Sequence, residues 1–256
     1  MAQAAITFEH VSKQFNQCGY AAVDDVSFTV EQGEFVTILG SSGCGKTTLL
    51  KMVNRLYQPD AGKILLFGKD IAKTDAVQLR RSIGYVIQQI GLFPHMTIEE
   101  NIATVPQLLH WEKATISKRV TELLDLVGLP AQEFRNRYPA QLSGGQQQRV
   151  GLARALAAQP KIMLMDEPFG AIDAITRMGL QDELLALQKE LNKTILFVTH
   201  DINEAFRLGN RVMIMNQGRI CQFDTPKNIL ENPADAFTKA LIDSAKAQQR
   251  FWEDFT

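Results

Sequence analysis

Residues 40–48 read GSSGCGKTT and match the phosphate-loop pattern G-x-x-x-x-G-K-[ST]. An apolar run at 35–39 precedes the match and a helical pattern at 46–56 follows it, which is the context that the pattern requires. Glycines let successive backbone N–H groups approach an anion, and the start of a helix adds its dipole. The stretch therefore predicts a cradle for nucleotide phosphates rather than an idle glycine turn. Its members are Gly40, Ser41, Ser42, Gly43, Cys44, Gly45, Lys46, Thr47 and Thr48.

Around the cradle, short apolar runs alternate with longer segments of helical period, the pattern of an α/β fold. Helical patterns dominate 98–156, with an apolar stripe along 112–127. We expect one ATP-binding domain over 1–234, with a helical subdomain inserted at about 89–159, and a C-terminal helix and tail over 235–256. Further strands are expected at 6–8, 26–30, 64–67, 83–87, 162–165, 195–198, 212–215 and 220–223, and a hairpin turn at 216–219.

The composition narrows the classes of function. The formal net charge is −1, from 27 basic and 28 acidic residues, which argues against a general grip on nucleic acid. The three cysteines are scattered and offer no metal-ligand spacing, a pattern that suits a reducing compartment. No apolar run approaches the roughly 20 residues that span a bilayer. If the protein acts at a membrane, we therefore expect it to bind there through a partner protein.

Two acids follow the buried-type strand at 162–165, namely Asp166 and Glu167. Ligands of such folds bind at the carboxyl ends of the strands. With Lys46 reaching the β- and γ-phosphates and Thr47 offering its hydroxyl to Mg²⁺, Asp166 is expected to hold the same ion. Glu167 is then expected to polarise the attacking water. Taken alone, the pair is equally well explained as a helix cap beside a solvated charge.

A second glycine cradle lies at 142–149, which reads LSGGQQQR before another helical pattern. Ser143 is a good N-cap, and the glycines after it expose backbone N–H groups. The segment predicts a second anion site, weaker than the first because no lysine follows; a capped helix with an idle glycine start is the alternative. Its members are Ser143, Gly144, Gly145 and Gln146.

Together these motifs resemble those of ABC-type ATPases. The segment 142–149 resembles their signature motif, while 40–48 and 165–168 resemble their Walker A and Walker B motifs. The resemblance covers nearly the whole chain in order. It implies a P-loop NTPase (RecA-like) core with an antiparallel β subdomain and an inserted α-helical subdomain.

The resemblance also assigns roles to residues that carry little signal singly. Gln88 is similar to the Q-loop glutamine that senses Mg²⁺ and the γ-phosphate, and His200 to the switch histidine that contacts the γ-phosphate. The segment 169–173 is similar to the D-loop, although it reads Gly-Ala-Ile-Asp where Ser-Ala-Leu-Asp is commoner. An aromatic ring normally stacks on adenine in this family; Phe15 fits best, and Tyr20 is a rival.

In this family the signature motif of one subunit closes over the phosphates of another, so the resemblance implies an ATP-bound homodimer with two composite sites. Three uses of ATP remain open: a membrane transporter, a soluble ATPase acting on nucleic acid or ribosomes, and a small-molecule kinase. The kinase ranks last because of the signature motif. A GTPase is disfavoured because 192–195 reads NKTI and lacks the acid of Asn-Lys-x-Asp.

The segment 91–102 resembles the region of bacterial importers that faces the permease, with Leu92, Phe93 and Met96 as a docking surface or, alternatively, as core. The segments 85–95 and 103–106 resemble the osmoprotectant branch, which imports glycine betaine, carnitine or choline. An importer for another solute, such as an amino acid, is the alternative. The implied partners are two integral-membrane permease subunits and, indirectly, an extracytoplasmic solute-binding protein, but no nucleic acid. The implied location is the cytoplasmic face of the inner or plasma membrane.

Overall fold

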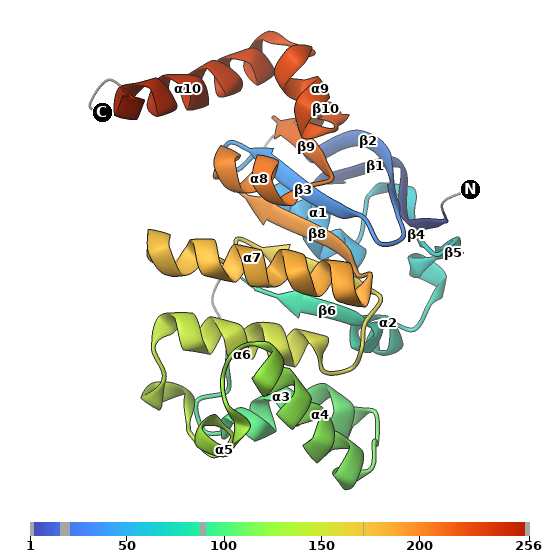
Figure 1. Ribbon diagram of the computed structural model, residues 1–256. Coiled ribbons are helices and arrows are strands. Elements are labelled where there is room, and N and C mark those ends of the chain that lie inside the picture. The colour runs from blue at the N-terminus through green and yellow to red at the C-terminus, as the bar shows by residue number, and fades with distance from the viewer. Residues whose placement is uncertain (1–2, 16–20, 88–90, 171, 254–256) are drawn as a thin grey trace. The chain divides into compact units, whose positions relative to one another are not determined.

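The computed structural model describes residues 3–15, 21–87, 91–170 and 172–253. The chain divides into two compact units, and only the arrangement inside each unit is defined. The first unit contains Met1–Ala76 and Thr194–Thr256, and the second contains Val77–Lys193. In Figure 1 the first unit runs from blue to cyan and then from orange to red, and the second runs through green to yellow.

The first unit contains an antiparallel sheet of four strands in the order β2-β1-β4-β5. Its strands are β1 (Ala4–Gln14), β2 (Ala21–Glu31), β4 (Ala61–Leu66) and β5 (Lys69–Asp70). β1 and β2 are longer than the predicted strands at 6–8 and 26–30. The reason is that register shifts beyond Phe8 interrupt the alternation of buried and exposed residues, so the sequence pattern marked only one end of each strand.

A second group of strands in this unit carries the phosphate loop. β3 (Phe35–Gly40) lies between β8 (Thr194–Thr199) and β9 (Arg211–Asn216) and is parallel to both. β10 (Arg219–Asp224) pairs antiparallel with β9, which confirms the predicted hairpin. Every residue of β3 and β8 is buried, as expected for strands covered on both faces.

Four helices accompany these strands: α1 (Lys46–Val53), α8 (Ile202–Leu208), α9 (Pro226–Glu231) and α10 (Ala236–Glu253). The predicted helix at 46–56 is too long, because Asn54 caps α1 and Arg55 turns to a φ of 54°. The C-terminal helix is present where it was predicted. Its Ile242 joins an apolar cluster with residues of α8, α9, β3 and β9, namely Ala205, Ile229, Leu39, Val212 and Ile214.

The second unit is mainly helical. The strands β6 (Ile83–Val86) and β7 (Ile162–Asp166) pair in parallel. Three helices contact one another, namely α3 (Ile98–Leu108), α4 (Lys113–Leu126) and α6 (Gly144–Leu156). All five predicted stripe residues of 112–127 are buried, namely Ile116, Val120, Leu123, Leu124 and Val127. The boundaries of the inserted subdomain stay a prediction. The other helices are α2 (Ala76–Ser82), α5 (Ala131–Phe134) and α7 (Ala174–Leu191), and a short 3₁₀ turn occurs at Pro139–Gln141. Another short 3₁₀ turn, Ile71–Lys73, belongs to the first unit.

Among the residues that the structure describes, no helix combines the length and the apolar character needed to cross a lipid bilayer.

Candidate functional site

The lysine of the phosphate loop, Lys46, is hydrogen-bonded to the backbone of the same loop. Lys46 is the first residue of α1 and is only 6% exposed. Its Nζ donates hydrogen bonds to the carbonyl oxygens of Gly40, at 2.7 Å, and of Ser41, at 2.9 Å. A buried ammonium must be hydrogen-bonded, and these two carbonyls supply acceptors. The sequence between β3 and α1 therefore places a positive charge at the centre of the loop.

Two glycines of the loop, Gly40 and Gly45, are required by close packing, whereas Gly43 leaves its backbone accessible. A Cβ on Gly45, whose φ is 106°, would lie 2.1 Å from the carbonyl oxygen of Ala22, so only glycine fits. A Cβ on Gly40 would lie 2.2 Å from the carbonyl oxygen of Met215, a packing demand that the sequence did not reveal. A Cβ on Gly43 would meet nothing within 4 Å. At Gly43 the backbone therefore faces open space, where an anion can approach.

Cys44 occupies the loop as a packing residue. It is 4% exposed, and burial raises the pKa of its thiol, although nearby Lys46 acts in the opposite direction. The neutral thiol fills space beside Gly40, where an added Cβ would lie 2.7 Å from the Cys44 Sγ.

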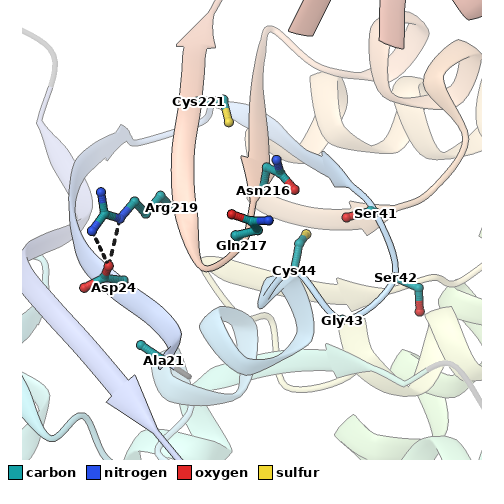
Figure 2. A pocket seen from close by; sticks show the side chains of 10 residues that line it. All are labelled: Ala21, Asp24, Ser41, Ser42, Gly43, Cys44, Asn216, Gln217, Arg219 and Cys221. Carbon is teal, nitrogen blue, oxygen red and sulfur yellow. Dashed lines mark hydrogen bonds and ion pairs between the residues drawn. The ribbon is translucent and has the colours of Figure 1, made fainter. Parts of the chain in front are cut away.

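A cavity of about 770 Å³ opens beside the loop (Figure 2). Ser41, Ser42, Gly43 and Cys44 form one side of it. The other lining residues come from the start of β2 and from the β9–β10 hairpin, namely Ala21, Asp24, Asn216, Gln217, Arg219 and Cys221. Backbone N–H groups at a helix start, a central ammonium and an adjoining cavity fit the phosphates of a nucleotide.

The two acids lie in the second unit. Asp166 ends β7 and is 6% exposed. Glu167 is half-buried and has a φ of 45°, a conformation that few residues with side chains adopt. A hydrogen bond from the Gly170 N–H to the Glu167 carbonyl oxygen, 3.2 Å long, closes the turn that holds this conformation. Backbone strain of this kind concentrates at functional sites.

The second glycine cradle has the predicted helix cap. Ser143 is the N-cap of α6; its hydroxyl accepts from the Gln146 N–H, and the Gln146 side chain accepts from the Ser143 N–H. Ser143 and Gly144 are exposed, and a Cβ on Gly144 would meet nothing within 4 Å. The helix start is therefore open to an approaching anion.

The remaining predicted residues differ in how fully the structure describes them. His200 is exposed and directly follows β8, next to Asp201, which caps α8. Gln88 and Tyr20 lie outside the described residues. Within the described ranges, no three His, Cys, Asp or Glu side chains gather at one point. This is compatible with the predicted set of Thr47, Gln88 and Asp166, because proteins usually bind Mg²⁺ through one or two carboxylates together with substrate phosphates.

The ring of Phe15 has other neighbours and does not line the cavity. It packs edge-on against Tyr57, with ring centroids 5.2 Å apart, and the Nζ of Lys13 lies 5.6 Å from its centroid. Its stacking on adenine stays a prediction. We expect Phe15→Ala to weaken ATP binding by roughly 5- to 150-fold, the loss of about 1–3 kcal/mol of stacking. Equilibrium titration of ATP against Phe15→Ala and Tyr20→Ala measures it, and a loss confined to Tyr20→Ala contradicts the choice.

One wall of the cavity is formed by the β9–β10 hairpin, which no sequence motif indicates. The sequence pattern of 216–219 indicates only a turn, whereas Asn216, Gln217 and Arg219 line the cavity beside the phosphate loop. Their positions in the sequence lie more than 160 residues from the loop, so no local pattern signals the contact. Only the pairing of β9 with β3 brings them there.

Comparison with known proteins gives a consistent set of relatives. A family model described as "ABC transporter" matches residues 23–170. The chain is 57% identical to a carnitine transport ATP-binding protein of Listeria monocytogenes, over 93% of this chain and 59% of the relative. It is 54% identical to a choline transport ATP-binding protein of Bacillus subtilis, over 95% and 64%. A glycine betaine uptake system ATP-binding protein of Escherichia coli is 49% identical, over 93% and 76%. The chain thus spans about three-fifths of the length of the first two relatives.

Solved structures agree with the fold. The dimeric structure of a bacterial ABC transporter cassette is 36% identical and superposes with a TM-score of 0.77, covering 86% of this chain and 98% of that one. A subunit of an ABC transporter complex of Clostridium perfringens is 28% identical, with a TM-score of 0.82 and coverage of 91% and 92%. A post-hydrolysis dimer bound to ADP and Pi is 35% identical over 86% of this chain and 98% of that one, with a TM-score of 0.77.

Proposed function

The chain belongs to the ABC transporter family, and from that premise we propose that it is the ATP-hydrolysing subunit of an importer for a small solute. The observation that carries the proposal is the phosphate loop, where Lys46 is buried against the carbonyls of Gly40 and Ser41. The loop presents open backbone at Gly43 to a cavity large enough for a nucleotide.

Each site residue has a distinct task in this proposal. Lys46 and the N–H groups of the loop bind the β- and γ-phosphates. Thr47, Gln88 and Asp166 would hold Mg²⁺, which would neutralise phosphate charge. Glu167 accepts a hydrogen bond from the attacking water and polarises it, while His200 contacts the γ-phosphate. The residues of one chain thus bind the nucleotide and orient the attacking water, and no side chain forms a covalent bond to the phosphate.

The working unit in this proposal is a homodimer. The exposed start of α6, with Ser143 as its cap, presents N–H groups and a positive helix end without a lysine of its own. A second copy of the chain supplies the phosphates that this surface closes over. The dimeric structures of similar cassettes support this arrangement.

The proposed docking surface for a permease is a loop in the second unit whose backbone is hydrogen-bonded to Asn101. Asn101 is fully buried and holds the loop through its side chain, which accepts from the Phe93 N–H at 2.8 Å and donates to the carbonyl of Met96 at 3.2 Å. Phe93 is 40% exposed, whereas Leu92 and Met96 are half-buried. A cavity of about 320 Å³, lined in part by Phe93 and Arg154, adjoins it. An exposed aromatic side chain beside a cavity suits an inserted helix of a partner.

We propose a quaternary-amine osmoprotectant as the solute, because carnitine, choline and glycine betaine appear in the names of relatives about half identical to this chain. An importer for another solute, such as an amino acid, is the second candidate. In either case the chain works at the cytoplasmic face of the membrane through two permease subunits, and a solute-binding protein outside the membrane selects the solute.

The test is reconstitution. The chain is assembled in proteoliposomes with permease subunits and a solute-binding protein from the same organism, and ATP hydrolysis is measured with each solute. We expect glycine betaine, carnitine or choline to stimulate hydrolysis, whereas amino acids leave it at its basal rate. Stimulation by an amino acid alone would overturn the solute class. Failure of the chain to bind any permease would overturn the importer and favour a soluble ATPase acting on nucleic acid or ribosomes.

A further inference from the structure

The turn between β9 and β10 is braced against the phosphate loop. We propose that this turn fixes the orientation of a phosphate-binding peptide group, and that Asp24 and Arg219 are positioning residues that hold the turn in place. The inference rests on the proposed binding of ATP at the loop. It adds residues of β2 and β10 to the support of the phosphate loop, whose own motif covers only 40–48.

The brace is a continuous chain of hydrogen bonds within the first unit. The N–H of Gly218, in the turn, donates to the carbonyl oxygen of Cys44 in the loop, at 3.1 Å. The carbonyl oxygen of Gly218 accepts from the N–H of Asp24 in β2, at 2.9 Å. The Nε of Arg219 donates to the Asp24 carboxylate at 2.7 Å, and Figure 2 shows this pair at the wall of the cavity. One turn thus connects β2 to the loop.

The contact with Cys44 matters because of peptide geometry. No peptide bond in the described residues is cis, so the carbonyl of Cys44 and the N–H of Gly45 point in opposite directions within the plane of their shared peptide. Holding the carbonyl toward Gly218 therefore aims the Gly45 N–H away from the hairpin. Rotation of this peptide would present a carbonyl oxygen, rather than an N–H group, to an anion. The brace therefore fixes the direction in which the Gly45 N–H points, and in this proposal that N–H binds phosphate.

Gly218 is the residue that makes the close approach possible. Its φ is 80°, and an added Cβ would lie 2.8 Å from the carbonyl oxygen of Ala21 and 3.3 Å from that of Ala22. Any side chain there pushes the turn away from β2. Because the same turn carries the donor to Cys44, such a displacement lengthens the bond to the loop.

The ion pair between Asp24 and Arg219 orients the turn from its open side. The carboxylate of Asp24 receives both the Nε and a terminal nitrogen of Arg219 at 2.7 Å, while the side chain of Arg219 is 74% exposed. An exposed pair contributes little to overall stability. Its effect is therefore expected on the loop rather than on the fold.

The experiment compares Gly218→Ala and Arg219→Gln with the wild-type chain. Hydrogen exchange over 40–48, measured without nucleotide, is expected to be faster in both variants. Affinity for ATP is expected to fall roughly two- to tenfold, the equivalent of one weakened hydrogen bond. KM should rise by the same factor while kcat stays within about twofold, because the brace supports binding and not the chemical step. Reversing the pair with Asp24→Arg and Arg219→Asp together should restore affinity.

The matched control is Lys227→Gln, which removes an exposed cation paired with Glu231 in the same unit, away from the loop. It should leave exchange over 40–48 and ATP affinity unchanged. If the Gly218→Ala variant does not fold, the hydrogen exchange and ATP affinity of Arg219→Gln alone test the proposal. Unchanged exchange and unchanged affinity in Arg219→Gln would overturn the brace. The exchange measurement needs no nucleotide, so a wild-type chain that bound no ATP would overturn the proposed function without deciding the brace.

Discussion

Replacing Glu167 with glutamine is expected to lower ATP turnover by about 10²- to 10⁴-fold while leaving ATP binding intact. Glutamine keeps the shape of the side chain but is not basic, so the attacking water loses its acceptor. The direction of this side chain is set by the backbone, where Glu167 has a φ of 45°. Because glutamine has nearly the same size and shape, we expect the substitution to keep this conformation and the half-buried position. A steady-state phosphate-release assay and an ATP-binding titration measure the two effects separately.

The same variant should accumulate as an ATP-bound dimer, because hydrolysis no longer reopens the composite sites. Size-exclusion chromatography with and without ATP detects the shift. Glu190→Gln is the matched control, since Glu190 carries the same charge on an exposed position of α7. Turnover near that of the control in Glu167→Gln would remove Glu167 from its assigned role.

Replacing Lys46 with glutamine is expected to weaken ATP binding by roughly 10- to 100-fold, the equivalent of one hydrogen bond to a charged group. The ammonium is the charge at the centre of the loop, and its bonds to the carbonyls of Gly40 and Ser41 also hold the loop closed. The fold should survive, because a neutral amide costs less to bury than an ammonium. Isothermal titration with ATP and with ADP reports the loss.

The control for this variant is Lys51→Gln, on the same helix. Lys51 lies in the last turn of α1, with its Nζ 5.5 Å from the Tyr57 ring and away from the loop carbonyls. Its ATP affinity should match that of the wild-type chain. Equal affinities in both variants would mean that Lys46 does not contact phosphate.

Local chemistry was readable from the sequence because it depends on neighbours in the chain. The Ser143 cap of α6 and the apolar stripe of α4 follow from residue types three and four positions apart, and both are present. The phosphate loop was readable for the same reason, since its glycines and Lys46 lie within nine consecutive residues.

Other features depend on contacts between distant strands. The length of β1 and β2 was underestimated because their bulges break the alternation that the pattern uses. The glycine at position 40 is required by the carbonyl of Met215 in β9, and the ring of Phe15 is in contact with Tyr57. The residues in each of these contacts are far apart in the sequence, so a local sequence pattern cannot predict the contacts.

The sequence by itself determined that the chain has a phosphate loop, an acid pair after a buried strand and a capped second glycine cradle, because each is a short motif. Only the tertiary structure decided how the loop is supported. The Gly218 N–H meets the carbonyl of Cys44 because β9 pairs with β3, which brings the hairpin beside the loop. The φ of 45° at Glu167 is likewise set by the turn that closes on Gly170. A motif names the groups that can bind phosphate, and the packing of strands fixes the direction in which they point.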